Sequence, residues 1–371
     1  MSKQTSLKYG VGIDIGSEEF YVCMSVIDQS QQIKIKATTK FKNTTKGFED
    51  FYKWVCNHKK EALPIHYLME ATGIYYEQLG LFLSQKGCYI TVILAQKAKY
   101  YIKALGIKTK TDSVDAQALA TMVCQQHLPA WKPIGEQMYK LRQLTRQNIY
   151  LQELRSQLRN QLLATELSMF VSKEVKNHLE NLIKEVEKQV DDCYLLIQKS
   201  IESNPEWKRK VTQICAIKGV GLLTVANLIS ETNEFEMFEN QRQLVSYAGY
   251  DIVQNQSGKR EGKTRISKRG NNRIRRALHM SALQVVKYDQ KPFSDLYNRV
   301  FERTKIKMKG YTAVQRKLLT IMYSLWKKNE KYDSNFQTIV EKKVAPKKEA
   351  TLHQPIQVVL EDVNVLELVE S

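Results

Sequence analysis

Residues 9–15 read YGVGIDI, a stretch of glycine and β-branched residues with a single charged side chain, Asp14. β-branched residues favour extended backbone, so this stretch predicts a buried strand. Gly16 and Ser17 follow as a turn, and Phe20 to Ile27 predicts a second strand. A charged side chain within an apolar strand is costly unless it has a partner. Asp14 is therefore the first candidate functional residue.

The residues that follow alternate between strand and helix patterns. Strands are expected near Ile33–Ala37, at Ile65–Met69 and at Cys88–Leu94, and helices at 44–59, from about Ile74 to Gln85, and from Asp112 to about Gln125. The order β-β-β-α-β-α-β-α predicts an RNase H-like domain, in which helices flank a mixed sheet.

Three further acidic residues fall at the ends of these elements. Glu70 ends the fourth strand, and Asp112 and Asp115 share one face at the start of a helix. Mg²⁺ takes oxygen ligands such as carboxylates and substrate phosphates, and a two-metal site stabilises both the attacking and the leaving oxygen. Each acid alone is equally well explained as a turn or helix-capping residue. Together with Asp14 they favour a Mg²⁺ site.

One rival class shares the first motif. Actin-like phosphotransferases also carry D-x-G-S in their first strand, which Asp14 to Ser17 would satisfy. That class needs further glycine-rich phosphate loops, and the sequence lacks them.

Composition narrows the possible partners. The chain has 371 residues, 43% of them hydrophobic, and a net charge of +18. Such an excess of positive charge favours nucleic acid as the partner over an anionic membrane surface. No apolar run would span a bilayer and residues 1–8 lack a signal-peptide core, so we expect a cytoplasmic protein. The six cysteines are scattered without a C-x-x-C pair, which predicts reduced thiols rather than a zinc site.

Two segments suggest binding or association. Residues 96–111 interleave five lysines with Tyr100 and Tyr101, a pattern equally typical of a surface for unpaired bases and of a solvated helix face. After Pro129 and Pro133, an apolar heptad predicts two antiparallel helices in a coiled-coil hairpin, which either pairs protomers or forms an ordinary helical domain. The predicted seam comprises Leu144, Leu151, Leu154 and Leu158, then Val175, Leu179, Leu182, Val186 and Cys193.

The C-terminal part contains two candidate phosphate-binding features. Gly219-Val220-Gly221 between two apolar helices is typical of a helix-hairpin-helix, which seats a DNA phosphate, although a plain helix-helix turn also fits. Farther on, residues 259–276 hold nine Lys or Arg and one Glu. The residues of this segment expected to bind phosphates are Lys259, Arg265, Lys268, Arg269, Arg273 and Arg276.

Taken in order, these motifs resemble the DEDD transposases of bacterial insertion sequences, the one-ten group that is related to the Piv DNA invertases. The resemblance runs from about residue 8 to 330 and is carried by Asp14, Glu70, K-T-D-S-V-D-A with Asp112 and Asp115, the helical spacer, G-V-G, and Ser257-Gly258 before I-S-K-R-G-N-N-R-I-R-R-A-L. It implies a RuvC-like metal-binding domain at 1–130, a coiled-coil spacer at 131–205, a mainly helical transposase domain at 206–331 and a flexible tail at 332–371.

The resemblance also implies the chemistry. The four acids would bind Mg²⁺, and a serine of the C-terminal domain would attack DNA to form a phosphoserine intermediate. Ser257 is expected to be that serine, with Ser267 as the alternative. The expected partners are donor and target double-stranded DNA, a structured guide RNA from the element itself, and further copies of the chain.

Two other functions stay open from the residues alone. A metal-dependent resolvase or nuclease would use the acids to activate water and would form no covalent intermediate. A non-catalytic scaffold would bind nucleic acid and leave the acids unused.

Overall fold

The computed structural model describes residues 5–253, 256–257, 260–262 and 265–333. The chain forms two units, the first ending at Gly135 and the second beginning at Glu136. Among the described residues, no helix is both long enough and apolar enough to cross a membrane.

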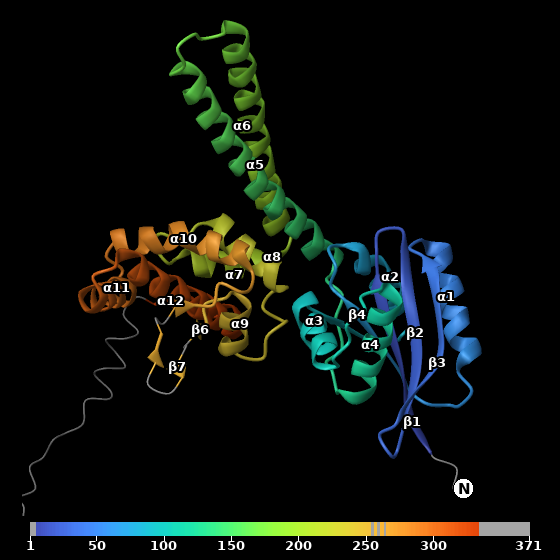
Figure 1. Cartoon of the computed structure of the whole chain (residues 1–371). Helices are drawn as coiled ribbons and strands as arrows, with labels where there is room; N and C mark the ends of the chain where they lie inside the picture. Colours follow the sequence, from blue (N-terminus) through green and yellow to red (C-terminus); the bar gives the residue numbers. More distant parts are fainter. Residues whose placement is uncertain (1–4, 254–255, 258–259, 263–264, 334–371) are drawn as a thin grey trace, which may run out of the picture. The chain divides into compact units, whose positions relative to one another are not determined.

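A five-stranded mixed sheet forms the centre of the first unit (Figure 1). Its strands are β1 (Ser6–Ile15), β2 (Glu19–Asp28), β3 (Ile33–Lys42), β4 (Ile65–Glu70) and β5 (Tyr89–Ile93), in the order β3-β2-β1-β4-β5. β2 is antiparallel to β1 and β3, whereas β4 is parallel to β1 and β5. The predicted RNase H-like mixed sheet is confirmed, with the stretch that contains Asp14 as its central strand.

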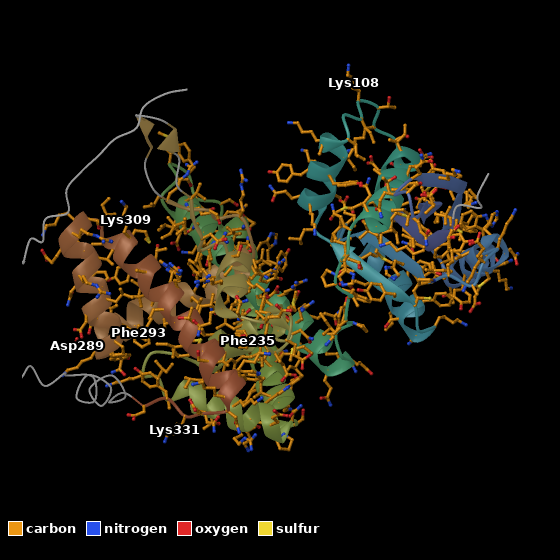
Figure 2. All side chains as sticks on the ribbon, turned by 90° about the horizontal axis from the view of Figure 1, so that it is seen from below. Lys108, Phe235, Asp289, Phe293, Lys309 and Lys331 are labelled. Atoms are coloured by element: carbon orange, nitrogen blue, oxygen red, sulfur yellow. The ribbon has the colours of Figure 1, made fainter. Side chains whose placement is uncertain are left out.

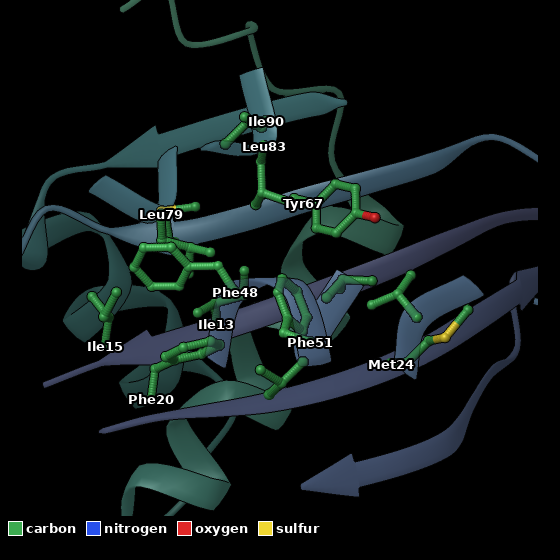
Figure 3. Packing of buried hydrophobic residues seen from close by; sticks show 14 of the residues in the cluster. Ile13, Ile15, Phe20, Met24, Phe48, Phe51, Tyr67, Leu79, Leu83 and Ile90 are labelled. Carbon is green, nitrogen blue, oxygen red and sulfur yellow. The ribbon is translucent and has the colours of Figure 1, made fainter. Parts of the chain in front are cut away.

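The two faces of β1 are covered differently because its side chains alternate. On one face, Val11, Ile13 and Ile15 pack in an apolar core with α1 (Thr45–His58) and α2 (Tyr75–Gln85), which contribute Phe51 and Leu79 (Figure 3). The other face carries Gly10, Gly12 and Asp14 and packs on helix α4 (Asp112–Gln125). The carboxylate of Asp14 therefore belongs to the α4 side of the sheet.

The two glycines are what allow α4 to lie directly on the strand. A Cβ at Gly12 would lie 2.1 Å from the backbone N of Ala120 and 2.2 Å from the backbone O of Ala116. At Gly10 a Cβ would lie 2.5 Å from the Sγ of Cys124. Since no side chain fits in that space, the helix backbone contacts the strand backbone. Helix α3 (Ala95–Ala104) precedes α4 and packs beside it.

The second unit begins with two long helices, α5 (Glu136–Glu166) and α6 (Lys173–Glu202), which lie side by side as a hairpin (Figure 1). The buried face of α6 consists of Leu179, Ile183, Val186, Val190, Cys193, Ile197 and Ile201. The predicted seam was partly wrong, because Leu182 and Val175 are 52% and 45% exposed. Each residue turns the helix by about 100°, so Ile183 points inward where its neighbour Leu182 points out.

The rest of this unit is mainly helical. Its helices are α7 (Pro205–Cys215), α8 (Leu222–Thr232), α9 (Gln241–Tyr247), α10 (Asn272–Lys287), α11 (Lys291–Thr304) and α12 (Lys307–Lys328). Phe235, Phe293 and Trp326 are fully buried in its core, and Figure 2 labels the first two. The expected burial of Trp326 and Tyr323 is confirmed.

Two short strand pairs between α9 and α10 were not predicted. β6 (Ile252–Val253) pairs with β9 (Arg265–Ile266), and β7 (Gln256–Ser257) pairs with β8 (Arg260–Glu261). Helix α9 also begins later than the expected Phe238, because the Asn240 side chain accepts a hydrogen bond from the N–H of Gln243 and caps the helix there.

Candidate active site

The four predicted acids lie on the same side of the sheet in the first unit. β1 and β4 are parallel neighbours, with Ile13 opposite Met69, so Asp14 and Glu70 follow at equivalent positions. Asp112 and Asp115 occupy the first turn of α4, the helix that packs on this face. Thr111 starts that turn by accepting a hydrogen bond from the N–H of Val114 at 3.3 Å. The fold thus gathers all four residues at one end of β1.

Their carboxylates are close enough to disturb one another electrostatically. The pKa of Asp14 is raised to about 7 by burial and by the charges of Asp112, Asp115 and Glu70, while Lys110 opposes the rise. Burial also raises the pKa of Asp115, again opposed by Lys110 and assisted by Asp112. An excess of like charge of this kind favours binding of a cation.

An open cavity of about 310 Å³ adjoins the cluster. Asp14 and Asp112 line it, together with the turn from Ile15 to Glu19 and Tyr21. Carboxylate oxygens are the donors that Mg²⁺ prefers, so the chemistry of the donor set fits a hard divalent cation. Within the described residues, however, no three His, Cys, Asp or Glu side chains are spaced so that they could hold a metal ion. The donors are of the right kind, and a bound cation would have to draw them closer.

The lysine-rich segment before α4 lies on the surface. Lys108 lies on the loop between α3 and α4 and points away from the protein (Figure 2). Tyr101 is tied to the protein, because its hydroxyl donates to the Oε1 of Gln125 at 2.6 Å. Tyr100 is 54% exposed. Stacking of bases on these tyrosines remains a prediction, for which Tyr100 is the better placed of the two.

In the second unit, Gly219-Val220-Gly221 connects α7 to α8 as a tight turn. Gly219 has φ 106°, and a Cβ there would lie 2.9 Å from the backbone N of Val285 in α10. Gly221 is the N-cap of α8, with open space around its Cα. The helix-turn-helix arrangement is as expected, and its contact with a DNA phosphate stays a prediction.

The basic stretch is held against the end of α9. The N–H of Lys268 donates to the carbonyl of Gly249, and Gly270, with φ 141°, passes so close to Tyr247 that a Cβ would lie 2.3 Å from its carbonyl oxygen. Lys268 and Arg269 are exposed, as is Arg265 in β9. These three cations are therefore accessible to a phosphate.

The other predicted phosphate contacts differ in their surroundings. Arg273, in the first turn of α10, has a side chain 44% exposed. Arg276 forms an ion pair with Glu153 of α5, so its guanidinium is engaged inside the protein rather than free as expected. Lys259 lies outside the described residues.

The two candidate serines lie on either side of the short strand pairs. Ser257 is in β7, opposite Arg260 of β8, and its side chain lies outside the described part of the structure. Ser267 donates its N–H to the carbonyl of Asp251 at 2.8 Å, and its Oγ is buried without a hydrogen-bond partner among the described residues. Ser257 as the nucleophile stays a prediction, with Ser267 as its alternative.

Sequence reasoning missed a buried carboxylate in this unit. Glu231, at the end of α8, receives two hydrogen bonds from Arg146 of α5, Nε to Oε1 at 2.6 Å and Nη2 to Oε2 at 3.0 Å. The Nδ2 of Asn271 donates to Oε2 at 2.8 Å, and Arg273 approaches Oε1 to 4.0 Å. Although burial acts to raise the pKa of Glu231, the hydrogen bonds from Arg146 and Asn271 and the nearby arginine charges lower it. The one signal in the sequence was an acidic residue at the end of an otherwise apolar helix.

Family models match both units. A model for DEDD transposases of the IS110 group matches residues 11–170, a range that includes all four acids. A second model, described as the transposase IS116/IS110/IS902 family, matches residues 211–298, which include the G-V-G turn, both serines and the basic stretch. Together the two models match more than half of the chain.

Similar proteins are found among curated sequences and solved structures. The pilin gene-inverting proteins of Moraxella bovis and Moraxella lacunata are each 27% identical over 325 residues, which cover 87% of this chain and 97% of theirs. The structure of T. thermophilus RuvC in complex with a Holliday junction substrate aligns with 30% of this chain and 90% of its own, at 11% identity and a TM-score of 0.24.

Proposed function

Because the chain belongs to the IS110 family of DEDD transposases and is thus an enzyme of DNA recombination, we propose that it exchanges DNA strands for an insertion sequence, using Mg²⁺ and a serine nucleophile. The observation that carries this proposal is the gathering of Asp14, Glu70, Asp112 and Asp115 on one side of the sheet, where the charges of the other three help to raise the pKa of Asp14. The similarity to two DNA-inverting proteins supports strand exchange as the reaction.

The proposed chemistry conserves phosphodiester bonds. Ser257 Oγ attacks a DNA phosphorus, an Oγ–P bond forms, and the bond from phosphorus to one deoxyribose oxygen breaks. The serine proton leaves, and the released deoxyribose oxygen takes up a proton and becomes a hydroxyl. A hydroxyl of the second DNA strand then attacks the phosphoserine and restores the Ser257 hydroxyl. The number of phosphodiester bonds is unchanged, so the exchange needs no nucleotide hydrolysis.

Each group of residues has a separate task in this scheme. Asp14, Glu70, Asp112 and Asp115 would hold Mg²⁺, which stabilises negative charge on the reacting phosphate when it is bound. Arg265, Lys268 and Arg269 are exposed cations that would bind and orient the DNA backbone. Gly219 and Gly221 would place the start of α8 against a second phosphate.

The partners in this proposal are donor and target DNA, a structured RNA from the element itself and further copies of the chain. The net charge of +18 supports binding to two kinds of nucleic acid but does not distinguish them. Purifying the protein from its host and sequencing any RNA that accompanies it tests the guide. A discrete species from the element is the expected result, and protein free of RNA contradicts this part of the proposal.

A trap for the covalent intermediate tests the serine. Wild-type protein incubated with its DNA and Mg²⁺ should give a protein–DNA adduct on a denaturing gel, and Ser257→Ala should give none. Ser267→Ala is the matched control, a serine ten residues away that should still form the adduct. An adduct with Ser257→Ala and none with Ser267→Ala would move the nucleophile to Ser267. If wild type cleaves DNA without any adduct, the enzyme is a metal-dependent nuclease, and nucleic-acid binding without cleavage indicates a scaffold.

Mixing inactive variants tests for a site shared between copies. Asp14→Ala lacks a metal ligand and Ser257→Ala lacks the nucleophile, so neither should exchange strands alone. If the acids of one copy work with the serine of another, the mixture should recover part of the activity. An inactive mixture of well-folded variants would indicate that each copy uses its own acids and serine.

A further inference from the structure

Helices α5, α8 and α10 meet around one ionised side chain, the Glu231 carboxylate. The side chain is only 1% exposed, and Arg146 grips both of its oxygens with the planar fork of its guanidinium. Asn271 holds the carboxylate from the start of α10 and also caps that helix, because its Oδ1 accepts from the N–H groups of Arg273 and Ile274. The position of the Arg146 fork is thus fixed from two directions.

Positive charge at this junction exceeds what the carboxylate requires. Arg146 alone would neutralise Glu231, yet Arg273 lies 4.0 Å from it and Arg142 donates from Nε to the carbonyl of the adjacent Ser230 at 2.8 Å. Three arginines therefore surround one buried carboxylate. By contrast, Arg159 farther along α5 pairs one to one with Glu187. A structural ion pair needs one cation, so the additional cations favour a second, external anion.

The arginines also remain accessible. The side chains of Arg146 and Arg273 are 39% and 44% exposed, although the carboxylate between them is buried. Arginine binds phosphate through two parallel N–H groups, and a guanidinium already fixed in place loses less freedom on binding. Arg273 also lies in the first turn of α10, where the helix dipole favours an anion.

We propose that Arg146 and Arg273, oriented by Glu231, form a binding site for a backbone phosphate of nucleic acid. This site deepens the function proposed above and rests on it, and it assigns a contact to the long helix α5. Both DNA and RNA carry the required phosphodiester, and the two are distinguished by the experiment below.

Binding without chemistry tests the proposal. Anisotropy of labelled duplex DNA and of labelled RNA of equal length, measured with EDTA present, excludes any effect on catalysis. Arg146→Lys keeps the charge but loses the fork, and should weaken binding of at least one of the two about tenfold. Arg146→Ala should also lower the slope of log affinity against log salt by about 0.9 if one DNA phosphate contact is lost.

Arg159→Lys and Arg159→Ala are the matched controls, on the same helix and with the same charge change. They should leave affinity and salt slope at wild-type values. The nucleic acid whose affinity falls selectively with Arg146→Lys is the one whose phosphate occupies the site. Equal behaviour of Arg146→Lys and Arg159→Lys with both ligands overturns the proposal.

Glu231→Gln separates orientation from charge. Removing a negative charge beside two arginines should tighten anion binding if the arginines act only as charges. If Glu231 orients their guanidinium groups, its replacement should weaken binding at unchanged or slightly lower Tm. Tighter binding would contradict the orienting role, and because Arg146→Lys leaves Glu231 in place, the site remains testable if Glu231→Gln folds poorly.

The outcomes also separate this proposal from the previous one. Wild-type protein that binds neither DNA nor RNA at any salt concentration contradicts both. Wild-type protein that binds normally while Ser257→Ala still forms the adduct contradicts only the serine assignment.

Discussion

The acid cluster of the first unit and the Glu231 cluster of the second unit present opposite charge balances. Burial acts to raise the pKa of both Asp14 and Glu231, yet the pKa of Asp14 rises to about 7 while that of Glu231 falls. Asp14 is surrounded by three other carboxylates and one lysine, whereas Glu231 is surrounded by arginines. The sign of the neighbouring charges therefore decides the ionisation of these two acids.

The comparison also indicates what each cluster lacks. Uncompensated carboxylates beside a cavity are suited to a cation, and an excess of arginines around a buried carboxylate is suited to an anion. The first arrangement is costly in the absence of its ligand, while the second contains a complete internal ion pair. Substitutions should therefore affect function and stability differently in the two clusters.

The largest expected effect is on activity in the acid cluster. Asp14→Ala should reduce strand exchange about 10³-fold or more, because a metal ligand that stabilises the reacting phosphate is lost. Gel assays of strand exchange with Mg²⁺ measure the change. Asp191→Ala, an exposed acid on α6, is the control and should retain activity. A loss of less than tenfold for Asp14→Ala would remove Asp14 from the metal site.

The next effect is on stability in the Glu231 cluster. Glu231→Ala should lower the free energy of unfolding by about 3–5 kcal/mol, since Arg146 loses the carboxylate that compensates its charge. Denaturant unfolding monitored by circular dichroism gives the value. Glu187→Ala removes the exposed partner of Arg159 and should cost less than about 1 kcal/mol. Equal costs for the two variants would mean that the buried cluster adds no special stability.

A third substitution disturbs the acid cluster without touching an acid. Gly12→Ala should lower the free energy of unfolding by about 3 kcal/mol and also reduce strand exchange, because the new methyl collides with the α4 backbone. Thermal unfolding and the exchange assay are measured together. Gly135→Ala, where the added Cβ meets nothing within 4 Å, should be close to neutral. Unchanged activity in Gly12→Ala would show that the seating of α4 on β1 does not control the site.

The smallest effect depends on pH. Because the pKa of Asp14 rises from its ordinary 3.8 to about 7 in the folded protein, folding favours its protonated form. That stabilisation is complete below pH 3.8 and is lost as pH rises through 7. In metal-free protein, Asp14→Asn should gain about 1–2 kcal/mol over wild type between pH 4 and pH 8, after allowance for solvent screening.

Unfolding curves at the two pH values, with and without Mg²⁺, provide the measurement. Millimolar Mg²⁺ should stabilise wild type and remove the advantage of Asp14→Asn at pH 8. A gain that is independent of pH would contradict ionisation as its cause.

Local signals explain why much of the first unit could be predicted. The α4 helix begins at Asp112 as expected, since Thr111 caps it and an apolar run follows within one turn. β1 was predictable because its apolar residues recur with one misplaced charge. From the strand order, Asp14 and Asp112 could be placed near each other before any coordinates were known.

Other features depend on contacts that no local pattern carries. Arg146 and Glu231 are separated by 85 positions, and Arg146 lies in a leucine-containing heptad that indicated only packing. The choice between Leu182 and Ile183 depends on the phase of the helix against its partner, which heptad spacing alone leaves open by one residue. The short strands β6 to β9 lie in a polar and basic stretch that lacks the apolar alternation of ordinary strands.

The close seating of α4 on β1 has a consequence for ion-size discrimination. A Cβ at Gly12 would lie 2.1 Å from the Ala120 N, whereas an ordinary contact needs at least 3.4 Å, so a side chain there would lift the helix by more than an ångström. Oxygen ligands lie about 2.0–2.1 Å from Mg²⁺ and about 2.3–2.6 Å from Ca²⁺, a difference smaller than that lift. Preference for one cation radius over another would then depend on Gly10 and Gly12, two residues that never touch the ion.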